Sequence, residues 1–107
     1  MKLLLAIVNN DDAHSVNSNL SKEGFFVTKI SSTGGFLMSG NSTFLMGIDD
    51  DQVEKAIGII GTHSQKRVQT VPFDMSYHNN GIAPTTGKVT VGGATVFVLN
   101  VEDCRHL

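Results

Sequence analysis

The sequence predicts an α+β fold in which strands and helices follow one another in the order β-α-β-β-α-β. Three observations lead to this prediction. A continuous apolar run opens the chain, two segments repeat apolar residues at helical spacing, and later segments cluster or alternate β-branched and aromatic residues. Two half-motifs in this order form an antiparallel sheet with both helices on one face, which is the ferredoxin-like βαββαβ sandwich.

The first half-motif begins with the apolar residues 3–8, which are typical of a central strand covered on both faces. The sequence NNDD then offers side-chain oxygens that can accept hydrogen bonds from the first-turn amides of a helix. The candidates for this N-cap are Asn10, Asp11 and Asp12. The helix is expected over about residues 12–23, because Ala13, Val16 and Leu20 recur at helical spacing. Gly24 follows at the position of a left-handed C-terminal cap.

The next segments complete the first half-motif and supply the strand and the helix that begin the second. Residues 25–33, FFVTKISST, predict a strand because they are rich in β-branched and aromatic side chains. Residues 42–48 predict the next strand, with Phe44, Met46 and Ile48 on one face. The acidic cluster at residues 49–51 is expected to cap a second helix that ends at Gly61. The inward stripe of this helix consists of Val53, Ala56, Ile57 and Ile60.

The C-terminal third of the chain combines a long connection with a final strand. Residues 64–87 show no period and contain both prolines, so an aperiodic long loop is expected there. The alternating valines of residues 88–101 predict the last strand, with a bulge or bend at Gly92 and Gly93. Because the strands are apolar on both faces, we expect subunit association to cover the face away from the helices.

Length and composition limit the possible partners. The 107 residues are expected to form a single domain, residues 1–107, of ordinary globular composition. A net charge of −2 argues against a nucleic-acid polymer as a partner. Cys104 is the sole cysteine, so no internal disulfide can form and a cytoplasmic location is expected. The N-terminal apolar run is too short for a membrane span of about 20 residues.

The sequence shows no convincing arrangement for catalysis or for a metal. The histidines stand on different predicted elements without paired spacing: His14, His63, His78 and His106. A zinc site needs three or four ligands that converge on one point, and the sequence has no such frame. Cys104 lies beside Arg105 and His106, but no third residue is available to orient a base. We therefore expect neither enzymatic activity nor a bound cofactor.

The glycine-rich connector STGGFLMSGNSTF, residues 32–44, is longer than a hairpin turn and carries apolar side chains. It lacks the lysine of a Walker loop, and it joins two strands, whereas a dinucleotide fingerprint joins a strand to a helix. Its amides could face an anion, and Phe36 and Leu37 could hold a base between them. Alternatively, the apolar residues fill a hydrophobic gap and the glycines only permit the turn. The chemistry of the connector leaves both interpretations open.

Several segments resemble the cyclic di-AMP receptor family of PII-like signal transduction proteins. They are AIV at residues 6–8, TKISSTGGFLMSGNSTFLMGIDDDQV at residues 28–53 and VTVGGATVFVL at residues 89–99. The likeness extends over nearly the whole chain. It implies a PII-like homotrimer in the cytoplasm of Gram-positive bacteria, with no catalytic turnover. Cyclic di-AMP would bind in clefts between subunits, reorder the long loop and change the surface offered to an unknown downstream protein.

The resemblance also implies a set of ligand-binding residues. In the family, the pocket is lined by a threonine of the second strand, a glycine-phenylalanine-leucine loop, the asparagine after it and a glycine near the end of the third strand. The matching residues in this sequence are Thr28, Gly35, Phe36, Leu37, Asn41 and Gly47.

One position departs from the family pattern. Family members commonly carry an arginine two residues before the strand threonine, where this chain has Phe26. Loss of one charged hydrogen bond costs on the order of 1.5–3 kcal/mol, which is roughly tenfold to a hundredfold in affinity. Lys29 or amides of the connector would have to compensate. The alternative function is an interaction module whose nucleotide site is lost or altered and does not bind cyclic di-AMP.

Overall fold

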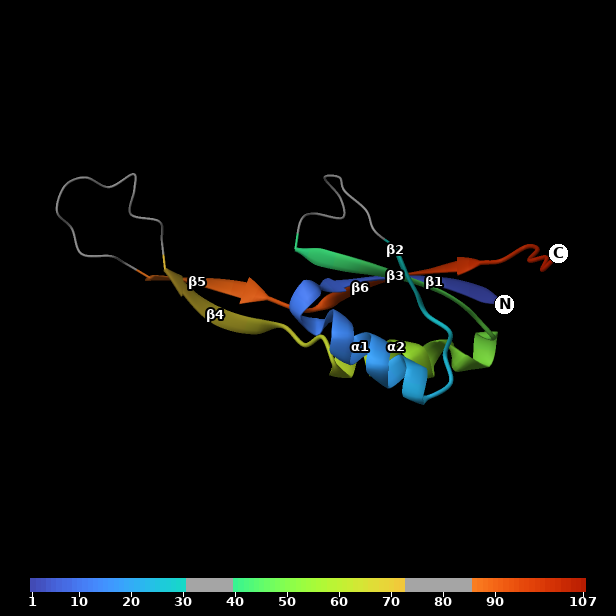
Figure 1. Ribbon diagram of the computed structural model, residues 1–107, viewed down its shortest axis with the longest axis horizontal. Helices are drawn as coiled ribbons and strands as arrows, with labels where there is room; N and C mark the ends of the chain where they lie inside the picture. Colours follow the sequence, from blue (N-terminus) through green and yellow to red (C-terminus); the bar gives the residue numbers. More distant parts are fainter. Residues whose placement is uncertain (31–39, 73–85) are drawn as a thin grey trace.

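The computed structural model describes residues 1–30, 40–72 and 86–107. Figure 1 shows the elements in chain order, with both helices on the same side of the main sheet. They are β1 (Lys2–Asn9), α1 (Asn10–Lys22), β2 (Thr28–Ile30), β3 (Asn41–Ile48), the 3₁₀ helix η1 (Asp50–Gln52), α2 (Val53–Thr62), β4 (Arg67–Pro72), β5 (Thr86–Val91) and β6 (Ala94–Asn100).

The main sheet has the strand order β2-β3-β1-β6, and every neighbouring pair is antiparallel. β1 and β3 pair along their whole length, from Lys2 opposite Ile48 to Asn9 opposite Asn41. β6 pairs with the other edge of β1. This order, with both helices on one face, confirms the predicted α+β fold of ferredoxin-like and PII-like type.

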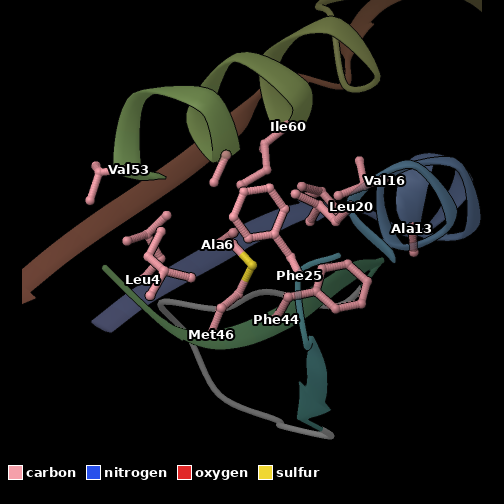
Figure 2. Packing of buried hydrophobic residues seen from close by; sticks show 13 residues of the cluster. Leu4, Ala6, Ala13, Val16, Leu20, Phe25, Phe44, Met46, Val53 and Ile60 are labelled. Atoms are coloured by element: carbon pink, nitrogen blue, oxygen red, sulfur yellow. The ribbon is translucent and has the colours of Figure 1, made fainter. Parts of the chain in front are cut away.

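The hydrophobic core lies between the helices and one face of the sheet. In Figure 2, Leu4 of β1 and Phe44 and Met46 of β3 point toward the two helices. Val16 and Leu20 of α1 and Ala56 and Ile60 of α2 are fully buried against them. The predicted inward stripes of both helices are confirmed, with Ile57 partly buried at the edge of the cluster.

The helix starts differ from the predictions. Asn9, not one of the three predicted residues, is the N-cap of α1, since its side chain accepts a hydrogen bond from the Asp11 amide at 2.8 Å. The acidic cluster before α2 forms η1 instead of a capping turn, and neither Asp49 nor Gln52 makes a side-chain cap bond. α2 also continues one residue past Gly61 to Thr62.

The second strand is shorter than predicted within the described residues. Phe25 precedes β2 and packs into the core, where its ring is 9% exposed, instead of alternating along a sheet edge. Val27 also precedes β2 and packs against the core from its edge. Residues 31–33 of the predicted strand lie outside the described residues.

Within the described residues, the connection between α2 and β6 contains two strands, so the expectation of an aperiodic long loop over residues 64–87 is wrong for residues 67–72 and 86–87. Residues 73–85 of the predicted loop lie outside the described residues. β4 and β5 pair from Arg67 opposite Val91 to Pro72 opposite Thr86 and form a two-stranded sheet. We call this sheet the arm, and it extends away from the main sheet (Figure 1). The predicted bend at Gly92 and Gly93 is confirmed, because both adopt positive φ, 84° and 79°, between β5 and β6.

Two glycines provide a test of the helix geometry. Gly58 lies on the exposed side of α2, and a Cβ there would meet nothing within 4 Å. Gly58→Ala is expected to raise the free energy of unfolding by about 0.5–1 kcal/mol, because alanine loses less backbone entropy in a helix.

Gly24 also has open space, but its φ is +87°. Gly24→Ala is therefore expected to destabilise the fold by about 1–2 kcal/mol. Urea titration measures the change in the free energy of unfolding for each variant, and the two changes should have opposite signs. Changes of the same sign would contradict this geometry.

Candidate functional site

The face of the main sheet opposite the helices carries the candidate site. Side chains alternate along each strand, and Phe44 and Met46 face the helices, so odd-numbered residues of β3 and their partners face the other way. We call this surface the helix-free face. Its members are Leu3, Leu5, Ile7, Thr28, Ile30, Asn41, Thr43, Leu45, Gly47, Thr95, Phe97 and Leu99. Its centre is apolar, and polar or small residues lie toward its ends and its β2 edge.

The structure places three of the six predicted ligand-binding residues on this face. Thr28 is exposed on the edge strand β2, directly opposite Leu45. Asn41 and Gly47 are exposed near the two ends of β3. Gly35, Phe36 and Leu37 lie outside the described residues.

Asn41 is held in place from the start of α1. The amide of Asn10 donates a hydrogen bond to the Gly40 carbonyl at 2.8 Å. The Ser42 hydroxyl donates to the side-chain oxygen of Asn10 at 2.5 Å. Gly40 has a φ of +89°, a conformation that favours glycine. Asn10 thus fixes both residues that flank Asn41.

Asn41 lines a cavity of about 230 Å³ at the junction of the main sheet and the arm. We call it the Asn41 cavity. Its lining residues are Ile7, Asn41, Lys66, Gly92, Gly93, Ala94 and Thr95. A lysine, an asparagine and a threonine therefore contribute to one concave surface. Sequence reasoning missed Lys66 and Thr95, and it assigned the glycine pair only a bend.

Gly47 lines a second cavity, of about 240 Å³, at the other end of β3. We call it the Gly47 cavity, and Phe26, Gln52 and Met1 also line it. The absence of a Cβ at Gly47 leaves room for Met1, because an added Cβ would lie 2.9 Å from the Met1 Cε. Phe26, which stands where the family commonly has arginine, is 93% exposed.

Beside this cavity, an ion pair joins the amine of Met1 to Asp50 of η1. The Met1 amine lies 2.9 Å from Asp50 Oδ1. This hydrogen bond, assisted by the positive charges of the amine and Lys2, holds the pKa of Asp50 below its usual range. Because the folded-state pKa is lowered, the pair adds stability above the pKa of the unfolded carboxyl, about 4. That stability is lost as the pH falls through the folded-state value.

The two cavities do not merge into one site within a single chain. A strand rises about 3.4 Å per residue, so Asn41 and Gly47 are roughly 20 Å apart along β3. Thr28 lies between them in register, beside Leu45. One compact ligand cannot occupy both cavities of the same chain and still contact each of them closely.

Lys29 is not placed to replace the missing arginine. It pairs with Phe44, whose side chain is buried toward the helices, so Lys29 belongs to the opposite face from Thr28. A separate cavity at α1 is lined by Lys29 together with His14 and Asn17. The suggestion that Lys29 supplies the missing charge beside Thr28 is therefore wrong.

Among the described residues, the remaining reactive side chains do not gather at either cavity, and His78 lies outside the described residues. Within residues 1–30, 40–72 and 86–107, no group of three potential metal ligands comes together. His63 Nδ1 lies 3.3 Å from the Ser15 hydroxyl between the two helices, and Cys104 is exposed near the C-terminus. No helix in the described part of the chain is long and apolar enough to cross a membrane.

The ferredoxin-like sheet, with the Asn41 cavity and the Gly47 cavity near opposite ends of β3, is a fold of the PII-like class. The model of the cyclic-di-AMP receptor family matches residues 1–107, and the chain belongs to this family of non-enzymatic signalling receptors. It is also similar to a crystal structure of a functionally unknown protein from Pediococcus pentosaceus, with 38% identity and a TM-score of 0.73. That match covers 99% of this chain and 96% of the other.

Proposed function

We propose that this protein is a cytoplasmic, non-enzymatic receptor that binds cyclic di-AMP in clefts between the subunits of a homotrimer. The observation that carries the proposal is the distribution of Thr28, Asn41 and Gly47 around the apolar centre of the helix-free face. Gly35, Phe36 and Leu37 belong to the proposed site because of the family resemblance alone.

The apolar centre of the helix-free face supports self-association. Phe97 and Leu99 are 38% and 47% exposed, and Leu3, Leu5 and Leu45 are partly buried. Burial of apolar area contributes about 25 cal/mol per Å², so other copies of the chain gain stability by covering this surface. The same strands carry the ligand-binding residues, so association would bring those residues to the edges of the interface.

The separation of the two cavities supports a ligand that lies between subunits. In a cyclic trimer, each interface joins different surfaces of adjacent subunits. The Asn41 end of one subunit can then face the Gly47 end of its neighbour across one cleft. In this arrangement a single dinucleotide contacts residues that are roughly 20 Å apart within each chain.

Such a receptor signals by changing the surface that it presents to a downstream protein when the ligand binds. The arm leaves the main sheet at Gly92 and Gly93, beside Asn41, so a ligand in the Asn41 cavity contacts the base of the arm. We propose that binding reorders the segment between α2 and β6, and that a downstream protein recognises the changed surface. No bond of the ligand is broken in this process.

A ligand panel tests the function. Cyclic di-AMP should raise the thermal unfolding midpoint with the logarithm of its concentration above Kd, with about 2.7 kcal/mol of stabilisation at a hundredfold excess over Kd. Cyclic di-GMP and AMP serve as controls, and chromatography should recover the cyclic di-AMP unchanged. No shift and no calorimetric heat at millimolar cyclic di-AMP would reject the proposal.

A second candidate function follows from Phe26. An exposed phenyl ring at the arginine position cannot form forked hydrogen bonds to a phosphate, so the site could have lost its nucleotide. The chain would then act as an interaction module. This alternative predicts a trimer whose stability is the same with and without every nucleotide of the panel.

A further inference from the structure

We propose that Lys66 supplies, from the Asn41 cavity of one subunit, the phosphate-binding cation of a cleft whose other side is the Gly47 cavity of the neighbouring subunit, where Phe26 stands in place of the arginine. This inference rests on the proposed function and names the group that recognises the ligand's charge. Lys66 and Asn41 line the same cavity, so the ammonium group and the amide can contact one bound anion.

The backbone around Lys66 is fixed on both sides. Ser64 is 1% exposed, its hydroxyl donates to the Ile60 carbonyl, and its own carbonyl accepts a hydrogen bond from the Gly93 amide. Arg67 donates to the Gln65 carbonyl at 3.2 Å. Lys66 therefore projects from a segment that is bonded to the end of α2 and to the start of β6.

The glycine pair is required for this placement. A Cβ on Gly92 would lie 2.5 Å from the Gln65 carbonyl oxygen, which is a backbone atom that cannot rotate away. A Cβ on Gly93 would lie 2.9 Å from Cγ and 3.2 Å from Cε of Lys66. The aliphatic part of the Lys66 side chain thus packs against the backbone of Gly93. This contact restricts the positions that the ammonium group can reach.

The charges around the cavity favour an anionic ligand. No carboxylate is among its lining residues, and no described carboxylate lies within ion-pair distance of Lys66. The neighbouring acid, Asp12, is already paired with Arg67 at 3.1 Å and is largely buried. The positive charge of Lys66 is therefore not neutralised by the part of the chain that the structure describes.

The chemistry of the lining matches a phosphodiester. The lysine ammonium offers three donors and the Thr95 hydroxyl one, and Asn41 lines the same cavity, which suits the acceptor oxygens of a phosphate. The other candidate cation beside Thr28, Lys29, lies on the opposite face of the sheet. Because Lys66 directly precedes β4, a phosphate bound to it also contacts the segment that leads into the arm.

The test is calorimetric titration of the full chain with cyclic di-AMP. Lys66→Gln should raise Kd roughly tenfold or more, because it removes a charged hydrogen bond, whereas Lys66→Arg should remain within about threefold of wild type. Lys22→Gln at the exposed end of α1 is the matched control for loss of one charge, and it should leave Kd unchanged. Both lysines are exposed, and unchanged thermal midpoints will show that the variants fold.

The outcomes separate the two proposals. Wild-type binding with an unchanged Kd in Lys66→Gln overturns the role of Lys66 and leaves the receptor function standing. An equal rise of Kd in Lys66→Gln and Lys22→Gln also overturns the role of Lys66. The rise would then reflect the loss of one positive charge anywhere on the chain. Absence of binding by the wild-type chain rejects the receptor function and, with it, the role of Lys66.

Discussion

Replacing Leu99 with aspartate is expected to convert the proposed trimer into single chains and to abolish cyclic di-AMP binding. Leu99 lies on the helix-free face of β6, opposite Leu3, and is 47% exposed in the isolated chain. Aspartate at this partly exposed position can remain hydrated when the chain is alone. In the proposed interface the carboxylate would be buried, at a cost of several kcal/mol for each ion. Sedimentation velocity measures the change of mass.

Val98 provides a closely matched control for this substitution. It is the preceding residue of the same strand, is 45% exposed and pairs with Leu4, which faces the helices. Val98→Asp is therefore expected to leave the oligomeric state unchanged. A trimer that persists in Leu99→Asp, or one that is lost equally in both variants, would contradict the assignment of the helix-free face as the interface.

Replacing Phe44 with alanine is expected to lower the free energy of unfolding by about 3–5 kcal/mol. Phe44 is 1% exposed and lies in the middle of β3, in the core between the sheet and the helix layer (Figure 2). Its removal would leave a cavity in the core cluster, whose members come from β1, β3 and both helices. A loss of this size is a large part of the 5–15 kcal/mol that stabilises a typical domain.

Phe26 is the control for the same chemical change at the surface. Its side chain is 93% exposed, so Phe26→Ala is expected to alter stability by no more than about 0.5 kcal/mol. Urea titrations at one fixed protein concentration compare the two variants, because association would also shift the apparent stability. A loss below about 1 kcal/mol in Phe44→Ala would mean that the core is not packed as described.

The fold could be predicted because its main elements are encoded by local patterns. Alternation along residues 42–48 identified which side chains of β3 are buried, and helical spacing identified the inward faces of α1 and α2. The element order then left the ferredoxin-like arrangement as the simplest topology. Periodicity was informative here because each of these segments is covered on one face by a different layer.

The errors concern features that depend on contacts between distant residues. The sequence of β4 has no clear alternation, and its strand is defined by pairing with β5 across about 20 residues. The helix starts were misplaced because several adjacent side chains in NNDD and DDDQ can all act as caps. In the folded chain, Asn10 bonds to Ser42 and Asp50 to the Met1 amine, so neither serves as a cap.

The candidate site was predictable only in part. Thr28, Asn41 and Gly47 were identified from the family resemblance, and the strand register explains why they share one face. Lys66 carries no local signal, because it is brought to Asn41 by the contact of residues 64–66 with Gly92 and Gly93. The misjudged role of Lys29 has a simple cause. Neighbouring strand residues face opposite sides, so proximity to Thr28 in sequence does not place Lys29 in the same site.

The most direct test of the account is the stoichiometry of cyclic di-AMP binding, measured by calorimetry together with the mass of the complex in solution. We predict one dinucleotide per chain, three per particle, and a particle mass three times the 11.5 kDa of the chain. The ligand should be recovered intact after incubation. A single-chain particle, or a trimer that takes up no cyclic di-AMP, would contradict the claim that the chain binds its ligand between subunits.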